Sequence, residues 1–83
     1  MKYKGLVKLI DNIKKIMAEK NMAQKELSIR TGVSHVTISC YMNYHSSPKL
    51  ETIAAIAIAL GVDVRELFAG IETEDMIWQI KMH

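Results

Sequence analysis

The segment from Leu50 to Leu60 constrains the fold most, because nine of its eleven residues are apolar. Four of its larger apolar members, Leu50, Ile53, Ile56 and Leu60, recur every three or four residues, which is the spacing of one helix face. Alanines fill much of the remaining circumference. A helix that is apolar around most of its circumference is normally buried on several sides. We therefore predict a central helix here, ended by Gly61.

Residues 4–19 show the pattern of an amphipathic helix. Leu6, Ile10, Ile13 and Met17 follow one another at intervals of four, three and four residues, and lysines fall on the other side. That spacing places the apolar side chains on one face of a helix. We expect this face to pack on the core and the lysines to remain solvated.

Two short helices are predicted between these longer ones. The first covers residues 24–31, and Gly32 follows it as a C-cap. The second begins at Ser34, whose hydroxyl can accept a hydrogen bond from an amide of the first turn. Ile38 and Tyr41 lie three residues apart and should anchor this helix to the core. Two helices joined by a tight turn that contains glycine form a helix-turn-helix.

The chain after Gly61 is predicted to contain one short helix and an extension. Asp63 and Glu66 have the spacing of a capping box and would open a fifth helix. The fold is thus an all-α, compact five-helix bundle over residues 1–69, with a C-terminal extension over residues 70–83. In the extension Thr73 could cap a sixth helix, strict alternation is the pattern of a half-buried strand instead, and disorder is the third alternative. The alternating apolar residues are Met76, Trp78, Ile80 and Met82. The predicted core includes Ile38, Tyr41, Ile53, Ile56 and Leu60.

Length and composition exclude several classes of protein. With 83 residues the chain has room for one domain only. Its single cysteine, Cys40, cannot form an internal disulfide or a zinc site of paired cysteines, which favours the reducing cytoplasm. No apolar run is long enough to span a membrane, and charges interrupt the N-terminus too often for a signal peptide. We expect a soluble protein without metal, cofactor or small-molecule effector, and not an enzyme, because no catalytic motif occurs.

Charge is distributed unevenly along the chain. Nine of the 11 basic residues stand within the first 50 positions, against three of the nine acidic ones. A basic front half and an acidic back half suit a module that presents one side to a polyanion. A lysine-rich helix that is merely solvated would give the same count.

Several motifs then resemble a known family in their order and separation. They are Gln24-Lys25-Glu26-Leu27-Ser28, Gly32-Val33-Ser34, Thr37-Ile38-Ser39, Tyr41, Asn43, Pro48-Lys49-Leu50-Glu51-Thr52 and Leu60-Gly61-Val62-Asp63-Val64-Arg65-Glu66-Leu67-Phe68. Together they resemble the lambda-repressor-like, Xre-type helix-turn-helix domain over about residues 9–68. The resemblance implies that the third helix, at about residues 34–44, enters the major groove of duplex DNA.

The resemblance also implies which residues would contact DNA. Base edges would be read by the outward side chains of the third helix: His35, Val36, Ser39 and Cys40. The sugar-phosphate backbone would be contacted by Gln24, Ser34, Asn43, Ser46, Ser47 and Lys49. Backbone contacts fix the register of the protein on the duplex, whereas groove contacts specify the sequence.

The sequence departs from the family pattern at three places that matter. Ala23 stands where a capping Ser or Thr is usual, which removes about 1 kcal/mol from the second helix. Tyr44 stands where glycine is common and would carry strain on the order of 1 kcal/mol in a left-handed conformation. Met42 replaces a frequent glutamate. The outer face of the third helix also lacks Arg, Lys and Gln, the strongest base readers.

Two functions follow from these observations. The favoured one is a sequence-specific DNA-binding transcriptional regulator of repressor type. The alternative is a protein-interaction module on the same scaffold, such as an antitoxin or an adaptor. We also expect a homodimer, because one module with few base readers offers little specificity. Its predicted pairing surface combines Met76, Trp78 and Ile80 with the end of the fifth helix near Phe68.

Overall fold

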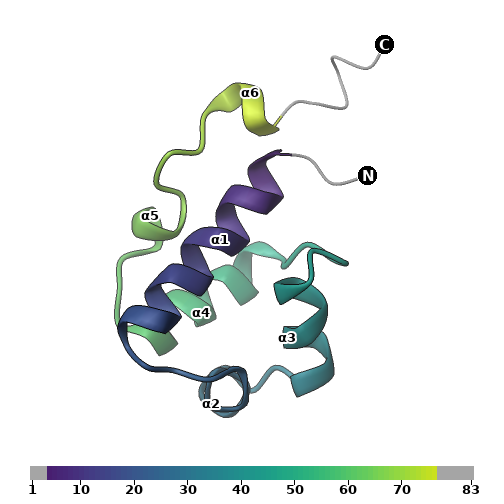
Figure 1. Cartoon of the computed structure of the whole chain (residues 1–83), viewed down its shortest axis with the longest axis vertical. Coiled ribbons are helices and arrows are strands. Elements are labelled where there is room, and N and C mark those ends of the chain that lie inside the picture. The colour runs from purple at the N-terminus through teal and green to yellow at the C-terminus, as the bar shows by residue number, and fades with distance from the viewer. Residues whose placement is uncertain (1–3, 77–83) are drawn as a thin grey trace.

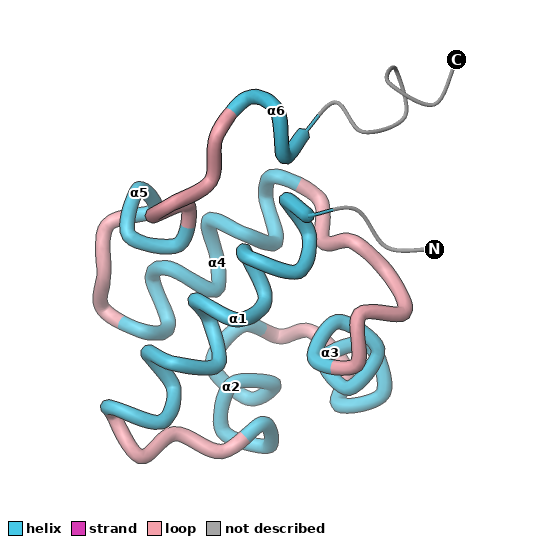
Figure 2. The backbone as a smooth tube through the Cα atoms, turned by 45° about the horizontal axis from the view of Figure 1, so that its top comes forward, coloured by secondary structure: helices cyan, strands magenta, loops and turns pink. Residues whose placement is uncertain are grey.

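The computed structural model describes residues 4–76, and all regular structure within that range is helical (Figures 1 and 2). The predicted all-α class is therefore confirmed. The helices are α1 (Lys4–Glu19), α2 (Gln24–Thr31), α3 (His35–Met42), α4 (Leu50–Leu60), α5 (Val64–Leu67) and α6 (Thr73–Met76). None of these helices is both long and apolar enough to cross a lipid bilayer.

One hydrophobic core joins the first five helices. The apolar face of α1 contributes Leu6, Leu9, Ile10, Ile13 and Met17, which are all buried. Helices α3 and α5 lie on opposite sides of α1, and α4 packs against α2 and α5 (Figure 1). The five core residues predicted from the sequence are confirmed, with exposed fractions between 0% and 8% for Ile38, Tyr41, Ile53, Ile56 and Leu60.

Helix α4 is less central than its composition predicted. Its inner face is buried through Ile53, Ile56 and Leu60, but Leu50 is 73% exposed and Ile58 is 80% exposed. Because the bundle consists of few, short helices, α4 has neighbours on one side only within residues 4–76. The prediction of a central helix is therefore confirmed for the inner face of α4 and wrong for its outer face.

The short helix α5 is held by the predicted capping box. The carboxylate of Asp63 accepts a hydrogen bond from the amide of Arg65 at 2.8 Å, and Glu66 Oε2 accepts one from the amide of Asp63 at 3.0 Å. Hydrogen bonds from the side chain and the backbone of Arg65 lower the pKa of Asp63. Phe68 follows α5 and packs partly buried against the core, whereas Glu66 and Ala69 beside it are exposed.

The described part of the extension is tied to α1 by polar contacts. Lys8 Nζ donates to the carbonyl of Gly70 at 3.0 Å and to Asp75 Oδ2 at 2.7 Å. Asn12 Nδ2 donates to the carbonyls that flank the end of α5, at 2.8 Å for Leu67 and 2.9 Å for Ala69. The first turn of the predicted sixth helix is present as α6, whereas the rest of that helix, or of the alternative strand of Met76, Trp78, Ile80 and Met82, falls outside the described residues.

Acid is expected to weaken this attachment through Asp75, which is buried at 7% exposure. The backbone amide of Glu72 and then Lys8 lower its pKa from the ordinary value of 3.8. A carboxylate with a lowered folded-state pKa stabilises the fold above its ordinary pKa and ceases to do so as the pH falls. We expect Asp75→Asn to lower the thermal midpoint at neutral pH, and the difference between the two proteins to shrink as the pH falls below the ordinary pKa of 3.8.

Circular dichroism melts over a pH series test this prediction. The control is Glu19→Gln, which removes an exposed carboxylate from the end of α1. A constant difference between wild type and Asp75→Asn at every pH would show that Asp75 contributes no pH-dependent stability.

Candidate nucleic-acid interface

The turn between α2 and α3 sets the geometry of the candidate interface. Gly32 adopts a left-handed conformation with φ 77°, and its amide donates to the carbonyl of Ser28. The hydroxyl of Ser34 then accepts a hydrogen bond from the amide of Thr37 at 3.2 Å. The predicted C-cap and N-cap are both present, so α2 ends and α3 begins within three residues.

Side chains of α2 brace this turn from inside. Ser28 Oγ donates to the carbonyl of Val33 at 2.5 Å, and Thr31 Oγ1 accepts a hydrogen bond from the Val33 amide at 3.2 Å. Thr31 Oγ1 also donates to the carbonyl of Leu27 at 2.8 Å. Both backbone polar groups of Val33 are therefore bound within the motif. This network holds α3 at a fixed angle to α2.

The inner face of α3 is anchored and its outer face is open. Ile38, Tyr41 and Met42 are buried in the core. His35 and Val36 are exposed, with Val36 at 74%, whereas Ser39 and Cys40 are half-buried. The sequence-predicted outward residues thus lie on one face of a firmly held helix.

The candidate backbone-contact residues surround that face. Gln24 is the first residue of α2 and is half-buried, and Ser34 is exposed at the start of α3. The other four are exposed residues at the end of α3 or in the loop that follows it: Asn43, Ser46, Ser47 and Lys49. The structure therefore brings the predicted residues together around α2 and α3.

Two of these polar side chains have structural partners that the sequence did not reveal. Asn43 Nδ2 donates to the carbonyl of Ser39 at 2.8 Å and closes the last turn of α3. The Ser34 hydroxyl donates to Thr37 Oγ1 at 2.9 Å besides capping the helix. Both residues hold the ends of α3 in addition to lying at its surface.

Ala23 leaves the start of α2 without a side-chain cap, as its sequence predicted. The first amides of α2 thus receive no hydrogen bond from Ala23. Loss of such a cap costs a helix about 1 kcal/mol.

Tyr44 adopts the left-handed conformation in which strain is expected, with φ 61°. Its hydroxyl donates to Asp11 and accepts from Lys14 Nζ at 3.0 Å, and that ammonium lies 4.4 Å from the centre of the tyrosine ring. A non-glycine residue in this conformation is strained by about 1–2 kcal/mol. The contacts with α1 offset the strain and fix the loop after α3, a role for Asp11 and Lys14 that no local pattern indicated.

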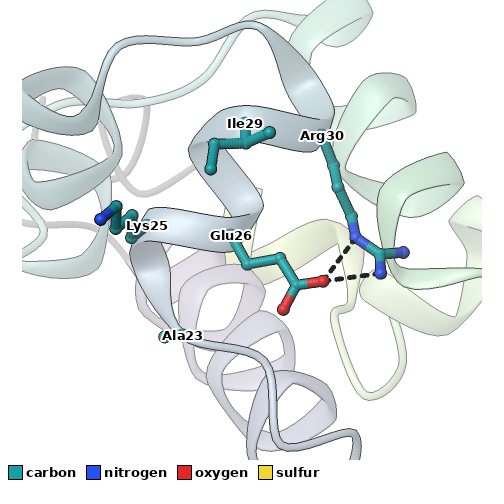
Figure 3. Close-up of a pocket in the computed structure, with 5 residues that line it drawn as sticks. All are labelled: Ala23, Lys25, Glu26, Ile29 and Arg30. Atoms are coloured by element: carbon teal, nitrogen blue, oxygen red, sulfur yellow. Dashed lines mark hydrogen bonds and ion pairs between the residues drawn. The ribbon is translucent and has the colours of Figure 1, made fainter.

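A shallow depression of about 470 Å³ lies along the outer side of α2 (Figure 3). Its lining comes from Ala23, Lys25, Glu26, Ile29 and Arg30. Glu26 and Arg30 form an ion pair of 2.6 Å, and Ile29 is 72% exposed. The depression is an open surface that extends along most of α2.

Known proteins share the helical fold of this chain. A family model described as helix-turn-helix matches residues 13–67, from the middle of α1 to the end of α5. The restriction-modification controller protein C.AhdI from Aeromonas hydrophila is similar at 26% identity and a TM-score of 0.75, with 80% of this chain and 100% of that chain covered. The wild-type controller C.Esp1396I is similar at 27% identity and a TM-score of 0.71, with 94% and 95% covered.

A third structure supports the fold alone. It is the hypothetical transcription factor NHTF from Neisseria, with 22% identity, a TM-score of 0.74, and 95% of this chain and 85% of that chain covered. No curated protein sequence matches this chain.

Proposed function

Because this chain belongs to the lambda-repressor-like, Xre-type helix-turn-helix family, we propose that it binds duplex DNA sequence-specifically and represses transcription. Membership of this family supports regulation of transcription through DNA binding, and repression is the more specific part of the proposal. The observation that carries the proposal is the outer face of α3, which is exposed at His35 and Val36 while the inner face is locked in the core. We assign DNA binding to residues 1–69. We further propose that the protein acts in the cytoplasm and does not catalyse a reaction.

In this proposal α3 lies in the major groove and reads base edges. The imidazole of His35 can donate or accept a hydrogen bond. The methyl groups of Val36 fit the thymine methyl, and Ser39 and Cys40 make weaker polar contacts. A good base contact contributes about 1–3 kcal/mol of discrimination. Backbone contacts then come from Gln24, Ser34, Asn43, Ser46, Ser47 and Lys49.

We also propose that the protein acts as a homodimer. Specific binding exceeds nonspecific binding by roughly 4–10 kcal/mol, which is more than the few readers of one copy supply. Two copies related by a two-fold axis double the contacts and place their α3 helices about 34 Å apart, in successive major grooves.

The alternative is a module that binds another protein. It is favoured by the absence of Arg, Lys and Gln from the outer face of α3. Such a module would bind its protein partner far more tightly than it binds DNA. It would show little or no preference for one DNA sequence over another.

Selection from random duplex DNA separates the two functions. The expected result is enrichment of one two-fold symmetric sequence with half-sites about 10 base pairs apart. Recovery of unenriched DNA after repeated rounds would contradict sequence-specific binding and favour the protein-interaction module.

Substitutions on α2 and α3 should weaken binding in different ways. Gln24→Ala should lower the affinity for all duplexes alike, because a phosphate contact carries no sequence information. His35→Ala and Val36→Ala should change the preferred bases within each half-site, by about 1–3 kcal/mol at the affected position. The measurement is titration of each variant against the selected site and single-base variants of it. Identical specificity profiles for all three variants would show that these roles are assigned wrongly.

A further inference from the structure

An apolar stripe runs along the outside of α4, opposite the face that packs on the core. Leu50, Ala54 and Ile58 stand four residues apart and are all exposed, at 73% for Leu50 and 80% for Ile58. Beyond the end of α4, Val64 is 36% exposed. Apolar surface that continues along a whole helix typically marks an interaction site. Within residues 4–76 no segment covers this stripe.

We propose that a second copy of this chain covers the stripe, with the two α4 helices packed antiparallel about a two-fold axis at Ala54. Leu50 and Ile58 lie equally far from Ala54 in the sequence. An antiparallel pair therefore places Leu50 of each copy against Ile58 of the other, so one surface is complementary to itself. The small side chain of Ala54 lets the two helices approach closely where they cross. This inference rests on the homodimer in the proposed function and names its interface.

Charge selects the antiparallel arrangement. Glu51 is the only charged residue on the outer face of α4, and it stands near the start of the helix. Arg30 lies near the other end, with Nη1 3.5 Å from the carbonyl of Ala59 and a side chain 51% exposed. An antiparallel pair brings Glu51 of one copy toward Arg30 of the other, whereas a parallel pair brings the two Glu51 carboxylates together. Opposite charges across an interface fix its register.

The size of the contact follows from the length of the helix. An interface of standard size buries about 800 Å² on each partner. Eleven residues of α4 span about 16 Å, which is too short to supply that area alone. In this proposal the contact therefore extends to exposed residues near the end of α4, at Arg30 on α2 and Val64 on α5.

Ile29 on α2 offers a matched control for the stripe. It is 72% exposed, close to the 80% of Ile58, but stands alone among Lys25, Glu26 and Arg30 (Figure 3). An isolated exposed isoleucine is ordinary on a protein surface. The same substitution at Ile29 and Ile58 therefore places the same charge at two similarly exposed sites, one outside the stripe and one within it.

Sedimentation velocity without DNA tests the interface. The wild type and Ile29→Lys are both expected to sediment as dimers. Ile58→Lys is expected to raise the dimer Kd at least about tenfold, which is a modest loss of affinity for the removal of one buried apolar contact. Circular dichroism verifies that both variants keep their helical content. A chain ending at Met76 should remain dimeric. Loss of its dimer would identify the tail as the interface, and a dimeric Ile58→Lys would also overturn the proposal.

Disulfide cross-linking tests the antiparallel arrangement. In a Cys40→Ser background, Ala54→Cys is expected to form a cross-linked dimer, because Cα atoms about 4.4–6.8 Å apart can be bridged. Leu50→Cys alone should not cross-link, since its counterpart lies at the far end of the stripe. Efficient cross-linking of Leu50→Cys would show a parallel pair. A wild type that is monomeric but still selects one DNA sequence would refute the dimer and leave the DNA-binding proposal intact.

Discussion

Replacing Ile56 by alanine is expected to lower the free energy of unfolding by about 2–5 kcal/mol. The side chain of Ile56 is fully buried on the inner face of α4. Alanine would remove the buried methyl and methylene groups and leave a cavity that the short helices around it can only partly close. Natural domains are stable by about 5–15 kcal/mol, so this single change should remove a large fraction of the stability of a domain this small.

Chemical denaturation at one fixed protein concentration measures this loss, because dimerisation makes apparent stability depend on concentration. Ile29→Ala serves as the control, since its exposed side chain should cost no more than about 0.5 kcal/mol. A loss of similar size in both variants would mean that the burial of α4 in the core is assigned wrongly.

Raising the salt concentration from about 50 to about 200 mM is expected to weaken DNA binding roughly tenfold or more. Each phosphate neutralised by a lysine or arginine releases bound counterions, so affinity falls steeply with salt. Lys49 is exposed in the loop after α3, beside the other candidate backbone contacts. Affinity that does not change with salt would contradict binding to the DNA backbone.

The slope of log affinity against log salt concentration identifies the lysines that contact DNA phosphates. Lys49→Ala should reduce the slope of log affinity against log salt by about 1. Lys15→Ala is the matched control, because Lys15 lies on the side of α1 that faces Glu66 and Ala69, away from α3. Equal changes for both lysines would show that only net charge matters and that no backbone contact is located at Lys49.

The bounds of the helices follow from local sequence. The glycines at positions 32 and 61 end α2 and α4, Ser34 caps α3, and the capping box of Asp63 and Glu66 opens α5. Each of these signals involves residues at most a few positions apart, and the same holds for the three- and four-residue spacing of the buried side chains. Local hydrogen bonding and helical periodicity therefore determined the inner face of every long helix before any tertiary contact was considered.

The tertiary structure decided which polar side chains form hydrogen bonds between segments that are far apart in the sequence. Lys8 and Asp75 are 67 positions apart, and Lys14 and Tyr44 are 30 apart, so no spacing in the sequence connects them. The count of lysines in the front half of the chain indicated a basic surface that either faces a polyanion or is merely solvated. Lys8 and Lys14 instead hold the extension and the loop after α3 against α1, because packing brings their partners within hydrogen-bond distance.

The outer face of α4 shows the same division between sequence and tertiary structure. Its sequence determined a helix that is apolar on nearly all sides, a composition that calls for burial on all sides. The number and the length of the other helices decided how much of that face the chain itself can cover, and within residues 4–76 they leave Leu50 and Ile58 exposed. The reason is geometric, since a helix at the edge of a small bundle has neighbours on one side only.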